Sequence, residues 1–182
     1  MKSKISRALK AALKHYPELK DTKIVLREKN SKYLMHILPI ISSIFNKKRK
    51  YQLIITKSQY KEFLNHLSEK EIEGWLGHEL AHALEYQSMP VIQILGFGLE
   101  YIFNPKMHKR TERRIDTKTI KHGLGKELEK GLLATFNSKE IPQKYKNRLK
   151  KYYLSPKEIQ KKLEKFKLKQ QLSQYPKNKH QS

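Results

Sequence analysis

The segment His78-Glu79-Leu80-Ala81-His82 decides which fold this chain is expected to form, because it matches the pattern H-E-x-x-H. On an α-helix, residues four apart share a face, so His78 and His82 can direct both imidazoles at one metal ion. Glu79 is rotated by roughly 100 degrees from His78, so it falls short of the metal but can reach a water bound to it. A zinc peptidase needs these parts: two nitrogen ligands, an open coordination position and a carboxylate that accepts a proton. The alternative is a buried helix with two unrelated histidines.

The residues around the motif predict one helix over 68–88. Ser68 and Glu71 form a capping-box pattern at its start, and a proline soon after residue 88 stops it. Gly74 and Gly77 each cost about 1 kcal/mol relative to Ala inside a helix. Another backbone, or a substrate, is therefore expected to come close there. The apolar residues at helical spacing are expected to face a core; they are Ile72, Leu76, Leu80, Ala83 and Leu84.

A third ligand would decide which subclass of zinc site this is. The metzincin pattern needs Gly and His three and six positions after His82, where this chain has Glu85 and Ser88, so that subclass is excluded. The acidic candidates downstream are Glu85, Glu100 and Glu112. Glu85 lies on the same helix as His82 and cannot easily complete a tetrahedron from the opposite side. Glu100 is the only acid of an apolar run.

Glu112 lies four residues before Asp116, so the two carboxylates share one helical face. Glu112 would bind the metal, and Asp116 would accept the spare N–H of a ligand histidine and fix its tautomer. The alternative is a solvated, salt-bridged face among the neighbouring basic residues Lys109, Arg110, Arg113 and Arg114. The upstream H-E-x-x-H motif favours the metal interpretation.

Two motifs, His78-Glu79-Leu80-Ala81-His82 and Glu112-Arg113-Arg114-Ile115-Asp116, are similar to those of the gluzincin-type zinc metallopeptidases, particularly M48-like peptidases and minigluzincins. The run from Ile120 to Gly125 is also similar to a group of short bacterial metallopeptidase-like proteins. The resemblance covers roughly residues 50–160.

The resemblance implies an α+β, zincin-like fold, mainly helical, with a small sheet before the active-site helix. It makes His78, His82 and Glu112 ligands of a zinc ion, Glu79 the general base and Asp116 the residue that orients a ligand histidine. Integral-membrane members of the family carry transmembrane helices. No segment of this chain is long enough for one, so substrates within a membrane are not expected.

The composition predicts one domain, because 182 residues suffice for a single core. Residues 1–160 are expected to form the metallopeptidase domain and 161–182 a basic, polar C-terminal helix or tail. Without cysteine there is no disulfide framework, and any metal must use His and carboxylate ligands. The N-terminus predicts an amphipathic helix near 3–16 in place of a signal peptide, which favours a cytoplasmic protein.

Two strongly apolar segments, 33–45 and 89–103, fall below the roughly 18 residues that span a bilayer. Burial in the core is the favoured interpretation. The alternative is a peripheral contact with an anionic membrane surface, which the basic cluster at 46–50 beside the first segment would support.

The expected strands are 23–28 and 50–56, the second rich in residues that strands favour. The resemblance makes the strand just before the motif helix an edge to which an extended peptide adds. Further helices are expected at 91–103 and 109–122, and the stretch 124–172 has a helical composition.

The net charge of +23 would attract nucleic acid, acidic lipid or acidic peptides. The lysines are spread along the chain and no nucleic-acid recognition motif is present, so specific nucleic-acid binding is not expected. Two functions therefore compete. The favoured one is a zinc peptidase acting on protein or peptide substrates. The other is a basic membrane- or nucleic-acid-binding protein whose zinc site is structural or vestigial.

A peptidase of this kind also needs a donor that stabilises the oxyanion. Tyr153 is the preferred candidate, and His122 and Tyr145 are the others.

Overall fold

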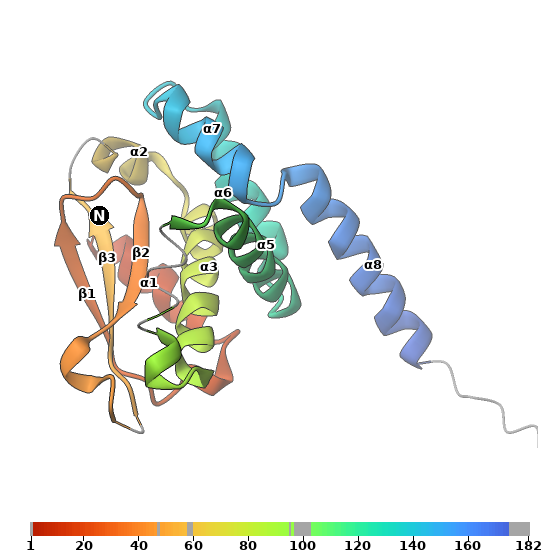
Figure 1. Cartoon of the computed structure of the whole chain (residues 1–182). Helices are drawn as coiled ribbons and strands as arrows, with labels where there is room; N and C mark the ends of the chain where they lie inside the picture. The colour runs from red at the N-terminus through yellow and green to blue at the C-terminus, as the bar shows by residue number, and fades with distance from the viewer. Residues whose placement is uncertain (1, 47, 58–59, 95, 97–102, 175–182) are drawn as a thin grey trace, which may run out of the picture.

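The computed structural model describes residues 2–46, 48–57, 60–94, 96 and 103–174. It is an α+β structure, mainly helical, with one three-stranded sheet (Figure 1), which confirms the predicted fold class at this level. The elements in chain order are α1 (Lys2–Leu13), η1 (Pro17–Leu19), β1 (Ile24–Lys29), β2 (Met35–Pro39), η2 (Ile41–Ser43), β3 (Tyr51–Thr56), α2 (Lys61–His66), α3 (Glu69–Ser88), α5 (Pro105–Lys121), α6 (Gly125–Asn137), α7 (Gln143–Tyr152) and α8 (Pro156–Gln174).

The sheet has the order β1-β3-β2, with β1 parallel and β2 antiparallel to β3. Both predicted strands are confirmed within one residue at each end. The expectation that the strand before the motif helix is an edge is wrong, because β3 is the central strand. Five of its six residues are buried, and a strand buried on both faces needs a hydrogen-bonded neighbour on each side. The edge next to the motif helix is β2.

Strand β2 comes from the apolar segment 33–45, which the sequence did not identify as a strand. The N–H of Thr56 donates to the carbonyl of Leu34, and that of Ile40 to the carbonyl of Lys50. In an antiparallel ladder the odd-numbered residues of β2 therefore point their backbone groups away from β3. Pro39 occupies one of these outward positions, where a missing N–H costs no ladder bond.

Helix α3 forms as the sequence predicts. The Ser68 hydroxyl accepts from the Glu71 N–H, the Glu71 carboxylate accepts from the Ser68 N–H, and the helix ends at Ser88. A Cβ on Gly74 would lie 2.2 Å from backbone atoms of Glu127 in α6. The predicted close approach is therefore that of another backbone at Gly74, whereas a Cβ on Gly77 would meet the Leu124 side chain at 2.6 Å.

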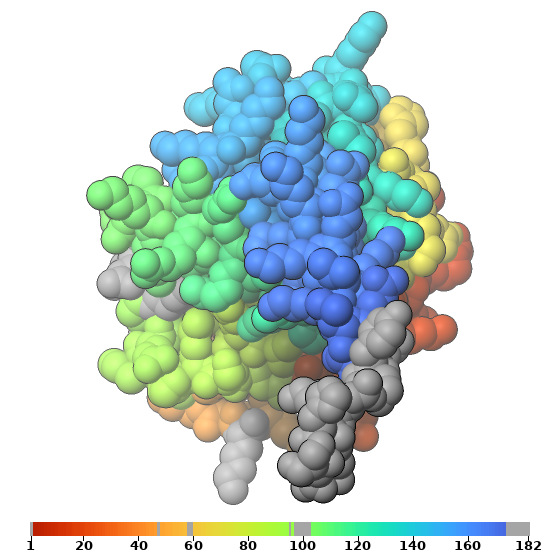
Figure 2. Space-filling view, turned by 90° about the vertical axis from the view of Figure 1, so that its right-hand side faces the viewer, coloured from red at the N-terminus to blue at the C-terminus, as the bar shows by residue number. Residues whose placement is uncertain are grey.

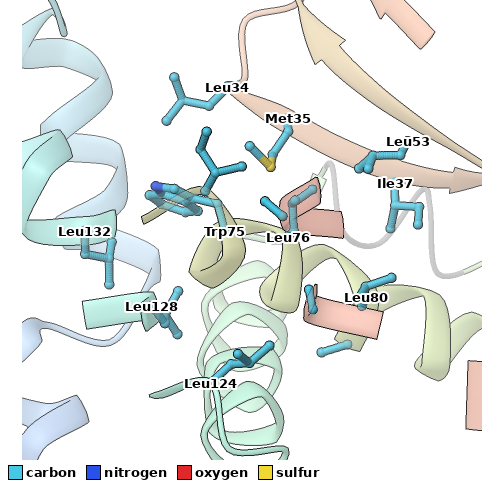
Figure 3. Packing of buried hydrophobic residues seen from close by; sticks show 14 of the residues in the cluster. Leu34, Met35, Ile37, Leu53, Trp75, Leu76, Leu80, Leu124, Leu128 and Leu132 are labelled. Atoms are coloured by element: carbon cyan, nitrogen blue, oxygen red, sulfur yellow. The ribbon is translucent and has the colours of Figure 1, made fainter. Parts of the chain in front are cut away.

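The core lies on both sides of α3 (Figures 1 and 3). Of the five residues predicted to face it, four are buried and Leu84 is partly buried. On one side α3 meets side chains of the sheet, and on the other it meets leucines of α6 (Figure 3). The labelled members of this cluster are Leu34, Met35, Ile37, Leu53, Trp75, Leu76, Leu80, Leu124, Leu128 and Leu132. Helix α3 is thus held from both sides, which fixes the motif that it carries.

Helices α5 to α8 follow as the predicted helical stretches. Helix α8 packs against α5 and α6 and lies across the face shown in Figure 2. The expected domain boundary at 160–161 falls inside α8, where Ile159 is buried and Leu163 and Phe166 still contact the core. Most of the helix expected at 91–103 lies outside the described residues.

Candidate metal centre

Three side chains from two helices meet in the interior. His78 and His82 come from α3 and Glu112 from α5, which packs against α3. The His78 Nε2 lies 3.1 Å from Glu112 Oε2, and the His82 Nε2 lies 3.6 Å from Glu112 Oε1. One ligand atom from each of the three residues lies within 4.8 Å of the others, so the group could hold a metal ion.

Asp116 lies one helical turn past Glu112 and completes the arrangement. Its Oδ1 is 2.9 Å from the Nδ1 of His78, and its Oδ2 accepts the Leu154 N–H at 2.7 Å. Glu112 and Asp116 are both fully buried, so the alternative of a solvated, salt-bridged face is wrong for this pair. The Asp116 contact leaves the Nε2 of His78 pointing toward Glu112.

Glu79 lies beside this group and is held from the sheet. Its Oε2 accepts the N–H of Ile37 at 2.9 Å. That N–H belongs to an outward position of β2, so the edge strand orients the carboxylate. Only 7 % of the Glu79 surface is exposed.

The electrostatics of the group favour a bound positive charge. Burial by itself would raise the pKa of Glu112, but the hydrogen bonds from His78 and His82 hold it well below its usual range. Burial would lower the pKa of His78, but its contacts with Asp116 and Glu112 raise it well above the ordinary value. Burial raises the pKa of the Glu79 carboxyl and of Asp116. Buried carboxylates facing imidazoles thus attract a cation, either a proton or a metal ion.

His108 is a neighbour of the site that the sequence analysis did not name. It lies on α5 four residues before Glu112, and its Nε2 is 3.8 Å from Glu112 Oε1. Its ring stacks on Tyr152 with 4.0 Å between the ring centroids, and burial lowers its pKa. The available signal was the i, i+4 spacing to Glu112, which places both side chains on one face.

The three oxyanion candidates occupy different places. The Tyr153 ring stacks on His78 with 5.2 Å between centroids, so it touches the site. The Tyr145 hydroxyl is buried and accepts the N–H of Leu34. His122 stacks on Tyr16 beyond the C-terminal end of α5. Among the three, only Tyr153 has a described ring contact with a ligand histidine.

The other acidic candidates do not join the group. Glu85 accepts hydrogen bonds from the Arg114 guanidinium at 2.7 and 2.9 Å. This ion pair connects α3 to α5. Glu100 lies outside the described residues.

The two apolar segments divide between the core and the surface. In the first segment Leu34, Met35 and Ile37 are buried, whereas Ile41 and Phe45 are exposed by 82 % and 81 %. Among the described residues of the second segment, Ile94 is buried, whereas Ile92 and Phe103 are exposed by 76 % and 79 %. Within the described part of the chain, no helix combines the length and apolar character needed to cross a bilayer.

Comparison of the chain with protein-family models, with curated proteins and with solved structures finds no match. The function must therefore be argued from the site itself.

Proposed function

We propose that this chain is a zinc-dependent peptidase with a zincin-like fold of the gluzincin type. The observation that carries the proposal is the convergence of His78, His82 and Glu112 on one point, with Glu79 beside them. Two histidines, one carboxylate and an adjacent carboxylate base are the components of a hydrolytic zinc site.

The spacing of the ligand atoms supports zinc. Ligands at about 2.1 Å from zinc in tetrahedral geometry lie about 3.4 Å from one another. The Glu112 carboxylate lies 3.1 Å from His78 through Oε2 and 3.6 Å from His82 through Oε1, distances close to this value. A chain without cysteine also offers the nitrogen and oxygen ligands that catalytic zinc commonly has.

When bound, zinc would act as a Lewis acid and lower the pKa of water. Glu79 would accept a proton from the attacking water and return it to the leaving nitrogen. Its raised pKa makes it a stronger base than an exposed glutamate. Asp116 would hold His78 in the tautomer that presents Nε2 to the metal.

The remaining parts of the site have candidates of their own. Strand β2 is the edge strand on the side of Glu79, so the role of a peptide-binding edge belongs to β2. Since Glu79 accepts the Ile37 N–H, an extended peptide would pair with the other outward backbone groups of this strand. Tyr153 is the proposed oxyanion donor because its ring lies against His78.

The test separates metal binding from chemistry. Purified protein is expected to bind one zinc per chain and to cleave a mixture of quenched fluorescent peptides. His78→Ala should lose both properties, and Glu79→Gln should keep the metal and lose cleavage. Glu164→Gln, an exposed carboxylate on α8, is the matched control and should retain both. Cleavage by Glu79→Gln at the wild-type rate would overturn the proposal.

The second candidate function is a basic membrane-binding protein with a structural metal. The observation that favours it is the exposure of Ile41 and Phe45 beside the basic residues Lys48 and Lys50. Apolar side chains next to lysines suit the interface of an anionic bilayer. Under this alternative, zinc removal would unfold the protein and no peptide would be cleaved.

A further inference from the structure

A pocket lies beside the metal centre, between the β1–β2 loop and α7. It has a volume of about 430 Å³, within the range of sites that hold small ligands. The residues that line it are Lys32, Tyr33, His108, Lys144, Asn147, Arg148, Lys151 and Tyr152.

The charge of this pocket has one sign. Its described lining contains four cationic side chains and no carboxylate, whereas two other pockets, one lined by α2 and α6 residues and one by α6 and α8 residues, mix acids with bases. Lys32, Lys144 and Lys151 form no ion pair with any described residue. The Arg148 guanidinium lies 4.0 Å from the centroid of the Tyr33 ring, which holds it in place. The pocket thus presents ordered positive charge above aromatic walls.

His108 joins the pocket to the metal centre. It lines the pocket, and its Nε2 lies 3.8 Å from the Glu112 carboxylate. A peptide in extended conformation advances about 3.3 Å per residue. One to three residues of such a peptide therefore span about 3–10 Å from a bond held at the metal, toward the pocket that His108 lines.

We propose that this pocket binds an acidic side chain, Asp or Glu, of an extended peptide substrate, and so gives the site a preference for acidic sequences. The inference rests on the proposed peptidase function, since it names the substrate class of that site. A partly open pocket of this size has room for one or two acidic side chains, whereas nucleic acid needs a continuous basic track and stacked bases. A bilayer would need an apolar face, and this pocket is ringed by charge.

The first experiment measures binding without cleavage, using the zinc-loaded Glu79→Gln protein. Three fluorescent peptides of equal length differ only at two adjacent positions, which hold Glu-Glu, Gln-Gln or Lys-Lys. At physiological salt the Glu peptide should bind roughly tenfold more tightly than the Gln peptide, as expected for two partly exposed ion pairs. Equal affinity for these two peptides would overturn the inference.

Matched charge reversals test where the preference arises. Lys144→Glu with Lys151→Glu removes cations from the pocket, and both residues are exposed, so the fold should persist. The control, Lys150→Glu with Lys157→Glu, changes the net charge equally but affects a different pocket. The first double variant should lose the preference for Glu, and the control should keep it. Equal losses of the preference in both double variants would mean general attraction to polyanions and would refute the proposed role of the pocket. The same conclusion would follow if a single-stranded oligonucleotide of the same charge concentration displaced the peptide equally well.

A cleavage experiment separates this inference from the proposed function. Wild-type protein is incubated with a peptide mixture, and the cut sites are identified by mass spectrometry. Asp and Glu should be enriched within three residues of the cut bond, and the pocket variant should remove the enrichment. Cleavage without this enrichment would refute the acidic specificity of the pocket but not the peptidase function. Selective binding of the Glu peptide without any cleavage would refute the peptidase function but not the binding of acidic side chains in the pocket.

Discussion

Replacement of Asp116 by Asn tests the geometry of the metal centre most directly. The carboxylate accepts at both oxygens: His78 Nδ1 lies at 2.9 Å from Oδ1, and the Leu154 N–H lies at 2.7 Å from Oδ2. An amide has only one accepting oxygen. If that oxygen faces Leu154, the amide N–H group faces Nδ1 and favours the tautomer with the proton on Nε2, which cannot bind a metal. If the oxygen faces His78, two N–H groups confront each other at Leu154.

Both arrangements have a cost that can be estimated. Loss of the residue that orients a metal-binding histidine lowers metal affinity about 10- to 100-fold, equivalent to about 1.4–2.7 kcal/mol. A buried donor left without an acceptor costs about 1–3 kcal/mol of folding free energy. Asp116→Asn should therefore weaken zinc binding by one to two orders of magnitude. If the amide oxygen faces His78, it should also lower the stability of the metal-free protein by about 1–3 kcal/mol.

The assay pairs zinc competition against a chromogenic chelator with urea unfolding of the metal-free protein. Glu164→Gln makes the same carboxylate-to-amide change at an exposed residue of α8. This control should leave zinc affinity unchanged and cost less than about 1 kcal/mol. Zinc affinity in Asp116→Asn equal to that of wild type would refute the role assigned to this contact.

Three further outcomes are expected. Gly74→Ala should lower the free energy of unfolding by about 1–3 kcal/mol, since its Cβ would meet backbone atoms of Glu127 at 2.2 Å. The control in the same urea titration is Gly96→Ala, which has open space around it and should not lower the free energy of unfolding. Binding of anionic liposomes at high salt should drop in Ile41→Asp and Phe45→Asp if the exposed apolar residues contact lipid, and indifference to both changes would exclude that surface. The pKa of Glu158 is lowered from 4.5 to about 2, chiefly by a hydrogen bond from Arg113, so its contribution to stability is present above pH 4.5 and lost as the pH falls toward 2. In urea unfolding measured between pH 5 and pH 2, Glu158→Gln should therefore lose less stability than wild type as the pH falls. An equal loss in both proteins would contradict this.

The predictable part of the fold is the part governed by local rules. Helix α3 begins directly after its cap Ser68 and ends at Ser88, because capping and a following proline act within a few residues. Strand β2 could not be recognised in this way, since its segment lacks alternation and includes Pro39. What makes it a strand is pairing with β3, a tertiary contact that the local sequence does not encode.

The same distinction applies to the site. The spacing within α3 brings His78 next to His82, with 5.0 Å between the ring centroids. The spacing within α5 places Glu112 and Asp116 on one face, where both contact His78. The hydrogen bond from Ile37 to Glu79 and the place of His108 depend on how separate elements pack. Periodicity within one helix says nothing about which strand lies over it.

The site is assembled from elements that pack on two sides of α3. Glu79 is oriented by β2 on the sheet side, whereas His78 is oriented by Asp116 on the side of α5. A metal ion held by His78, His82 and Glu112 would therefore connect α3 to α5 and add its binding energy to that interface. The hydrogen bond between Glu79 and Ile37 lies outside the set of metal ligands and needs no metal to form. Metal removal is thus expected to loosen the contact between α3 and α5 first and to leave the base oriented on the sheet.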